Sequence, residues 1–111
     1  MSRYVFVYHR PAWSAEAPEP TPEESKAGMA RWMAWHDRVG DRMVDFGTPL
    51  DDGVRVTSDA TTPSKREVVG YSIVEADSMD EVIALAEEHP HLDTTGGCEI
   101  EVHAALPLPS M

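Results

Sequence analysis

Three histidines and one aspartate of this 111-residue chain stand where they could do chemistry. His36 falls in a helical pattern at a position where a hydrophobic residue would be expected, and His89 and His91 flank Pro90. A histidine titrates near physiological pH, so each of them can act as a general acid or base. Asp45 stands near the predicted end of the same helix, where the helix dipole disfavours a carboxylate. The candidate catalytic residues are therefore His36, His89, His91 and Asp45.

Each candidate also has a purely structural interpretation. His36 can be a core or interface histidine with hydrogen-bonded ring nitrogens, because burying an imidazole without a partner costs free energy. His91 can be a turn residue bonded to the backbone, and Asp45 can pair with a nearby cation. His89 and His91 have a spacing that metals use, with His36 as a third ligand. No other metal, phosphate or nucleophile motif accompanies them, so the sequence predicts no metal and no cofactor.

His36 and Asp45 belong to residues 21–47, which are predicted to form one long helix. Its start has a capping box and a proline at the first helical position, made by Thr21, Pro22 and Glu24. Gly47 can take the left-handed conformation that ends a helix, and Gly40 inside the pattern predicts close packing or a kink. Apolar residues recur every three or four positions and predict one buried face, formed by Met29, Trp32, Met33, Met43 and Phe46.

The remaining segments predict four strands and a second helix. Residues 4–8 and 68–74 are apolar on both faces, which is typical of central strands, whereas residues 54–57 and 98–104 alternate like edge strands. Residues 78–88 carry a second capping box and end before Pro90. The order βαββαβ predicts an α+β, ferredoxin-like fold with a four-stranded antiparallel sheet and two helices on one face. Residues 10–21 and 58–66 are predicted loops, and residues 105–111 are a tail.

The chain has the length of a single domain. Two helices cover only one face of a four-stranded sheet, so the other face would expose apolar side chains such as Tyr4, Phe6 and Tyr8 or the alternate set. A second copy of the chain is the simplest cover, since most oligomers are symmetric homodimers. The sequence therefore predicts a homodimer with the two sheets packed face to face.

The charge and composition of the chain indicate which kinds of partner it is expected not to bind. The chain has 9 Lys+Arg against 20 Asp+Glu and a formal net charge of −11, which disfavours binding to nucleic acid or to an anionic membrane. No segment approaches the roughly 20 apolar residues of a membrane-spanning helix. The single cysteine, Cys98, suits a reducing compartment, so a cytoplasmic location is expected.

Several pieces of the sequence, taken together, resemble the YCII-related domain family. They are YVFVYHRP near the N-terminus, GYSIVEADS from Gly70, PHL at residues 90–92, and GG followed by IEV at residues 96–102. The resemblance covers nearly the whole chain and implies a dimeric α+β barrel. Most members have no assigned activity, and a few are lyase-like enzymes that remove halide from ring compounds. Members resemble one another in a histidine on the first helix, matched by His36, and an aspartate before a proline, where this chain has His89.

Two hypotheses about function follow. The first is a small homodimeric enzyme without cofactor, in which His36 or His91 removes a proton from a small organic substrate and promotes elimination or isomerisation. The second is a non-catalytic module that binds a small ligand or a protein partner. The enzyme requires that at least two of the four candidates converge on a cavity open to solvent.

Overall fold

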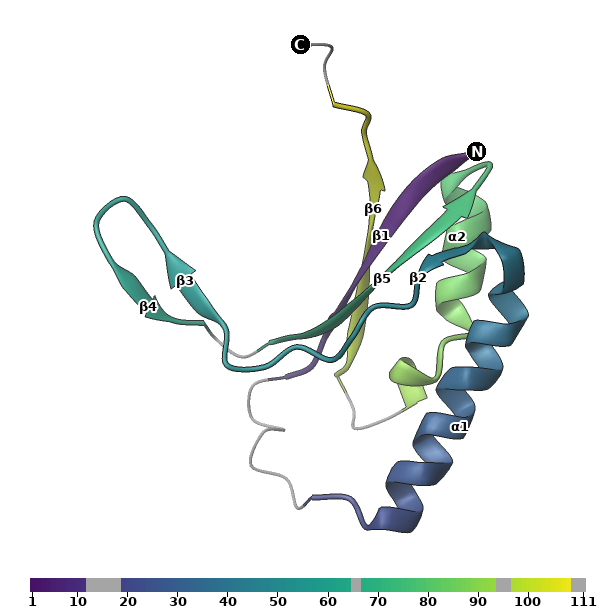
Figure 1. The fold of residues 1–111 in the computed structure, drawn as a ribbon, viewed down its shortest axis with the longest axis horizontal. Helices are drawn as coiled ribbons and strands as arrows, with labels where there is room; N and C mark the ends of the chain where they lie inside the picture. The colour runs from purple at the N-terminus through teal and green to yellow at the C-terminus, as the bar shows by residue number, and fades with distance from the viewer. Residues whose placement is uncertain (12–18, 65–66, 94–96, 109–111) are drawn as a thin grey trace.

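The computed structural model describes residues 1–11, 19–64, 67–93 and 97–108 (Figure 1). Predictions that concern residues 12–18 of the first loop, residues 65–66 of the second loop and residues 109–111 of the tail lie outside the described part. The elements of the main body follow in chain order as β1 (Ser2–His9), α1 (Pro22–Val39), β2 (Met43–Asp45), β5 (Val68–Ala76), α2 (Met79–Glu87) and β6 (Glu99–Ala105). Short 3-10 turns at Gly40–Arg42 and Pro90–Asp93 follow the two helices, and β3 (Val54–Val56) and β4 (Thr61–Pro63) form a separate hairpin.

The main sheet has the strand order β2-β5-β1-β6, and every neighbouring pair is antiparallel. Phe6 in β1 stands opposite Ser72 in β5 and Val102 in β6, which fixes the register of the three strands. The predicted α+β fold with a four-stranded antiparallel sheet is confirmed, and so are the central places of the first strand and of residues 68–74. The sheet of one chain does not close into a barrel.

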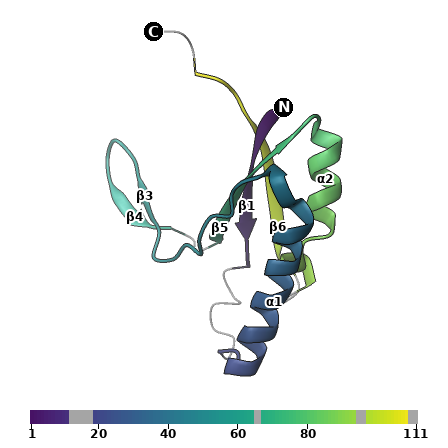
Figure 2. The same cartoon turned by 45° about the vertical axis from the view of Figure 1, so that its right-hand side comes forward.

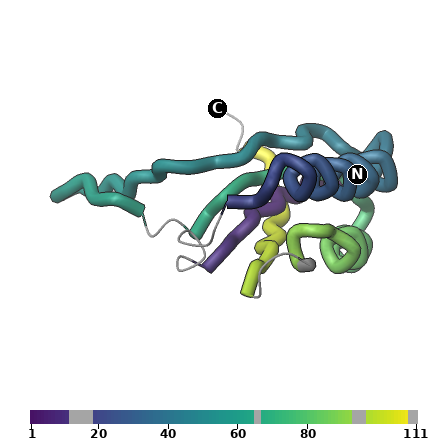
Figure 3. Tube along the Cα trace, turned by 90° about the horizontal axis from the view of Figure 1, so that it is seen from below, coloured from purple at the N-terminus to yellow at the C-terminus, as the bar shows by residue number. Residues whose placement is uncertain are grey.

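Both helices lie on one side of the sheet, and the core lies between the two layers (Figures 2 and 3). Tyr4, Phe6 and Tyr8 are the side chains of β1 that face the helices, and all three are buried. Trp35 joins the helices to each other, because its indole Nε1 donates a hydrogen bond to the Leu85 carbonyl at 2.9 Å. The alternate side chains of β1 point to the opposite, uncovered face.

The prediction of one helix over residues 21–47 is wrong beyond residue 39. The start is as expected, with Thr21 and Glu24 capping each other's backbone amides. The helix ends at Val39, because Gly40 takes a positive φ of 62° and turns the chain away. Asp45, expected at a helix end, therefore lies on β2, whose backbone pairs with β5. Trp35 and Val39 are the buried residues of α1. Of the predicted face, Trp32, Met43 and Phe46 are partly buried against the core, whereas Met29 and Met33 are 56% and 40% exposed.

The second strand of the main sheet was also predicted in the wrong place. Residues 54–57 were expected at its edge, but β3 pairs with β4 outside the main sheet. β4 lies inside residues 58–66, which were predicted to be a loop. The edge of β5 is occupied instead by β2 and by the following segment, where Leu50 N–H donates to the Val69 carbonyl at 3.0 Å. An alternating pattern identifies a strand, but it does not identify the neighbour with which that strand pairs.

Gly70 in β5 leaves room for close packing, and replacing it should destabilise the fold. An added Cβ would lie 3.3 Å from Cδ2 of the Tyr8 ring and 3.4 Å from the Thr48 carbonyl oxygen. Gly70→Val adds further methyl groups to this confined space, so we expect the free energy of unfolding to fall by about 1–3 kcal/mol. Urea denaturation of Gly70→Ala, which adds the Cβ alone, should give an intermediate value. An unchanged unfolding midpoint for Gly70→Val would contradict this packing.

Candidate functional site

Two of the predicted site residues, His89 and His91, meet inside the core at the C-terminal end of α2. Both are buried, and their ring centroids lie 6.3 Å apart. The ring of His89 is packed against three aromatic side chains, with centroid distances of 4.8 Å to Tyr8, 4.3 Å to Trp32 and 4.2 Å to Trp35. These contacts make the His89 ring a part of the aromatic core.

The protonation state of His89 follows from its hydrogen bond. Its Nδ1 accepts the backbone N–H of His91 at 2.9 Å, so Nδ1 is unprotonated and Nε2 carries the proton of the neutral ring. Burial, followed by the charge of His91, lowers the pKa of His89 to about 3. Its Nε2 has no hydrogen-bond partner among the described residues, and only 1% of the residue is exposed. At physiological pH His89 is therefore a neutral ring sealed from solvent.

His91 connects two strands. Its Nε2 donates a hydrogen bond to the carbonyl oxygen of His9, the last residue of β1, at 2.8 Å. Burial lowers the pKa of His91, and hydrogen bonds from the ring to the backbone of His9 and of Glu99 oppose that change. Because Glu99 begins β6, His91 fixes the end of β1 beside the start of β6.

His36 and Asp45 lie elsewhere. The Nδ1 atom of His36 is 3.3 Å from Oδ1 of Asp37, and its ring packs on Phe46 with a centroid distance of 5.0 Å. Asp45 accepts the Gly47 backbone N–H at 2.8 Å and the Tyr71 hydroxyl at 3.3 Å. The negative charge of Asp45 is the main cause of a raised pKa of Tyr71, with burial and the hydrogen bond adding to it.

The four predicted candidates thus form no single site. His89 and His91 are brought together in packed core, whereas His36 and Asp45 are each held by local contacts. None of the four lines either of the two pockets described below. Their catalytic roles stay predictions.

A different group of titratable side chains meets on the uncovered face of the sheet. Glu101 in β6 bridges two histidines, with Oε2 3.0 Å from Nε2 of His9 and Oε1 2.6 Å from Nε2 of His103. The hydrogen bond from His103 is the main cause of a lowered pKa of Glu101, and burial opposes it. We call His9, Glu101 and His103 the histidine–glutamate cluster.

His9, Glu101 and His103 were not among the candidates that the sequence predicted. The alternation of residues 98–104 places Glu101 and His103 on one face of β6. It cannot show that His9 lies beside them, because that depends on the pairing of β1 with β6, in which Val7 stands opposite Glu101. The cluster is a product of strand register.

A polar pocket of about 260 Å³ opens beside His9. Its lining contains both positively and negatively charged side chains. The lining residues are His9, Arg10, Pro11, Glu67, Gly97 and Glu99. The backbone N–H of Arg10 donates to the Glu67 carbonyl at 2.7 Å, which joins the two sides of the pocket just beyond β1 and just before β5. The contact between His9 and Glu101 in the histidine–glutamate cluster therefore borders a solvent-open polar cavity.

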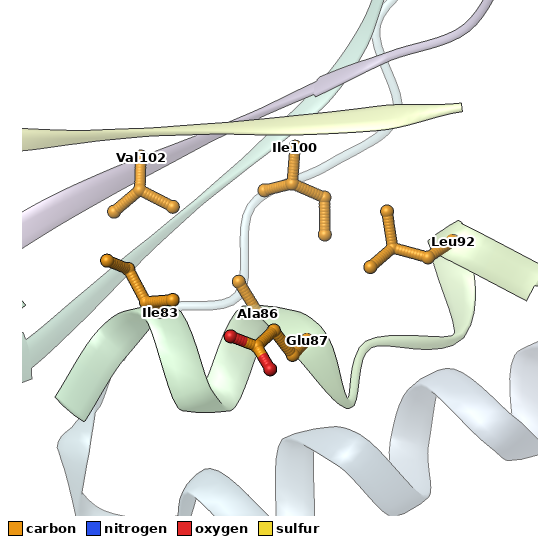
Figure 4. Close-up of a pocket in the computed structure, with 6 residues that line it drawn as sticks. All are labelled: Ile83, Ala86, Glu87, Leu92, Ile100 and Val102. Carbon is orange, nitrogen blue, oxygen red and sulfur yellow. The ribbon is translucent and has the colours of Figure 1, made fainter. Parts of the chain in front are cut away.

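A second pocket, of about 200 Å³, lies between α2, the turn at Pro90–Asp93 and β6 (Figure 4). Apart from Glu87 its walls are apolar side chains that point toward one another, and they are Ile83, Ala86, Leu92, Ile100 and Val102. It offers shape and apolar contact, with Glu87 as its one charged side chain. Of the two, the pocket beside His9 is the better candidate functional site.

The fold and this pocket define a small α+β protein with an uncovered sheet face and a polar site at one end of its central strands. The chain belongs to the YCII-related domain family, whose model matches residues 1–104. No curated protein matches the chain. Among the described residues, no group of three or more histidine, cysteine, aspartate or glutamate side chains is arranged to hold a metal ion. None of the described helices is both long and apolar enough to cross a membrane.

Proposed function

We propose that this YCII-related protein is a homodimer that binds a small polar organic molecule in the pocket beside His9. The proposal of a binding site rests on the lining of this pocket. The lining includes one guanidinium, one imidazole and two carboxylates, from Arg10, His9, Glu67 and Glu99. Such a set can bind a carboxylate through Arg10 and an amino or hydroxyl group through the acids. The volume of about 260 Å³ is at the small end for ligand pockets and suits a metabolite-sized molecule.

The uncovered face of the sheet supports the homodimer. Val5 stands opposite Ile73, and Val7 stands opposite Tyr71, so four large side chains form one apolar patch on that face. Charged groups border the patch, with the Arg3–Glu75 ion pair at one end and the histidine–glutamate cluster beside β6. An apolar centre with a polar rim is the usual composition of a protein interface.

The exposed surface of the single chain also favours a partner. The chain exposes 7983 Å², whereas a compact monomer of its mass exposes about 6,100 Å². Its radius of gyration is 15.6 Å, compared with about 13 Å for a compact domain of this length. The chain thus exposes about 1,900 Å² more than a compact monomer would. A stable interface buries about 800 Å² from each partner, so this additional exposed surface is large enough to form one.

A charge placed in the apolar patch tests the dimer. Val7→Glu should raise the dissociation constant of the homodimer at least 100-fold, because a carboxylate buried without a partner costs several kcal/mol. Sedimentation velocity over a range of protein concentrations measures this. Met33→Glu adds the same charge on α1, away from the patch, and should leave the dissociation constant unchanged. A wild-type chain that stays monomeric at micromolar concentration would refute the dimer.

Ligand binding is tested with a panel of amino acids and small hydroxy and oxo acids at millimolar concentration. A compound that binds the native state should raise the melting temperature of the wild-type protein, and titration calorimetry should give its affinity. Arg10→Ala should weaken binding at least tenfold, since it removes the cation that pairs with the ligand carboxylate. His36→Ala, remote from the pocket, should bind as the wild type does. Equal binding by Arg10→Ala would remove the pocket from consideration.

A second candidate, proton transfer, is favoured by one observation, the 3.0 Å contact of the His9 imidazole with the Glu101 carboxylate at the edge of the pocket. A carboxylate close to an imidazole is a common arrangement at general-base sites, and here it acts by proximity, because Nε2 of His9 has no hydrogen-bond partner among the described residues. NMR of small oxo acids in D₂O should then show deuterium entering the carbon next to the carbonyl group. His9→Gln should abolish this exchange, whereas His36→Gln should retain it. Binding without exchange by the wild-type protein would leave a non-catalytic module.

A further inference from the structure

The β3–β4 hairpin projects from the body as an arm (Figure 1). It leaves the sheet on the side opposite to the two helices, and this is plain in both views of the ribbon (Figures 1 and 2). The arm therefore extends on the same side as the uncovered sheet face. We call the two strands and their turn, residues 54–63, the arm.

One face of the arm is free of charged side chains. Val54 stands opposite Pro63, and Val56 stands opposite Thr61, so these four residues share a face. The two valines are 62% and 70% exposed. Arg55 and Thr62 share the other face.

A two-stranded hairpin is marginally stable in water unless a third strand or another layer covers it. Among the described residues, the backbone hydrogen bonds of the arm join it to itself and to its own base, as in Thr57 N–H to the Ala60 carbonyl and Ser64 N–H to the Gly53 carbonyl. Exposed valines at a sheet edge also favour pairing with another chain. The valine face is thus the part of the arm that a partner would cover.

We propose that the arm of one copy packs its valine face against the second copy, so that two arms clasp the homodimer. The inference rests on the homodimer proposed above and extends it to a second contact surface. A face-to-face pair places each arm beside the other copy, because the arm and the apolar patch lie on the same side of the sheet. The surface exposed in excess of a compact monomer, about 1,900 Å² per chain, is enough for the patch and the arm together.

The test compares two single substitutions on the same arm. Val56→Asp places a charge on the valine face, and Thr62→Asp places the same charge on the opposite face. We expect Val56→Asp to raise the dissociation constant of the homodimer at least tenfold in sedimentation velocity, with an unchanged far-UV circular dichroism spectrum. Thr62→Asp should leave it within a factor of two. A second readout is hydrogen exchange, in which the amides of residues 54–63 should become more protected as the wild-type protein passes from monomer to dimer.

The outcomes separate the two proposals. A wild-type homodimer that Val56→Asp leaves intact, or whose arm gains no protection on dimerisation, overturns the clasp and leaves the homodimer standing. Equal weakening by both substitutions also overturns it, since charge alone would then be responsible. A wild-type monomer overturns both proposals.

Discussion

Gly47→Ala is expected to destabilise the protein by more than about 3 kcal/mol, enough to unfold a marginally stable domain. Gly47 follows β2 with a φ of 82°, a conformation that strains any residue with a Cβ. The added Cβ would also lie in direct collision with the Tyr71 backbone carbonyl, at 1.7 Å from its oxygen. Neither group can move without breaking the pairing between the β2 segment and β5. We expect an insoluble protein or a melting temperature lowered by more than about 12 °C.

Gly28→Ala is the matched control and should have the opposite sign. Gly28 lies inside α1, and an added Cβ would meet no atom within 4 Å. Alanine is favoured over glycine inside a helix by about 1 kcal/mol, so the melting temperature should rise by a few degrees. The two variants differ only in the position of one methyl group. Calorimetry of both therefore measures how the space around that methyl group changes the melting temperature. Equal melting temperatures would show that the close contact at Gly47 does not exist in solution.

The second large effect is expected from acid. We predict that the free energy of unfolding falls steadily as the pH is lowered from about 6.5, and that His89 alone contributes about 1.4 kcal/mol per pH unit. The folded state holds the pKa of His89 at about 3, against an ordinary value of 6.5. Between these values the unfolded chain binds a proton that the folded chain does not, so protons favour unfolding. His91, whose pKa is also lowered, acts in the same direction.

Between pH 6.5 and pH 5 the change in the free energy of unfolding reports on the histidines rather than on the carboxylates. Glu24, Glu81 and Glu101 have lowered pKa values in the folded state, so the stability that they contribute is lost only at more acidic pH. Urea denaturation at several pH values in this window gives the slope. His89→Phe keeps an aromatic ring in the core and should reduce the slope by the share of one histidine, whatever its effect on stability at pH 7. A slope that is unchanged in His89→Phe would mean that His89 is not buried in solution.

The buried pair and the surface cluster have different consequences for function. His89 is a neutral core ring, while His91 acts on the pocket indirectly by holding the His9 carbonyl. The proposed binding site thus depends on the PHL segment of the family resemblance through positioning rather than through contact with a ligand. This accounts for a histidine in the core beside two tryptophans, since the ring of His89 accepts the backbone N–H of His91 and so fixes the backbone two residues further on.

The sequence by itself determined the local and one-dimensional features of this protein. Apolar residues on both faces identified β1 and β5 as the central strands of the sheet, and the strand order confirms both places. The capping residues located the starts of α1 and α2, since a cap is made by side chains three positions apart. The family could also be recognised from short pieces of sequence.

Only the tertiary structure decided which segments become partners. Residues 43–45 carry a helical pattern, yet they form β2 because the open edge of β5 offers hydrogen bonds that a continued helix would forgo. Residues 54–57 were correctly predicted to be extended, but they became the arm when that edge was occupied. The histidine–glutamate cluster joins residues from opposite ends of the chain, and His89 and His91 are buried by residues of β1 and α1. Strand pairing and burial depend on contacts between residues far apart in the sequence. The periodicity of one segment therefore cannot predict them.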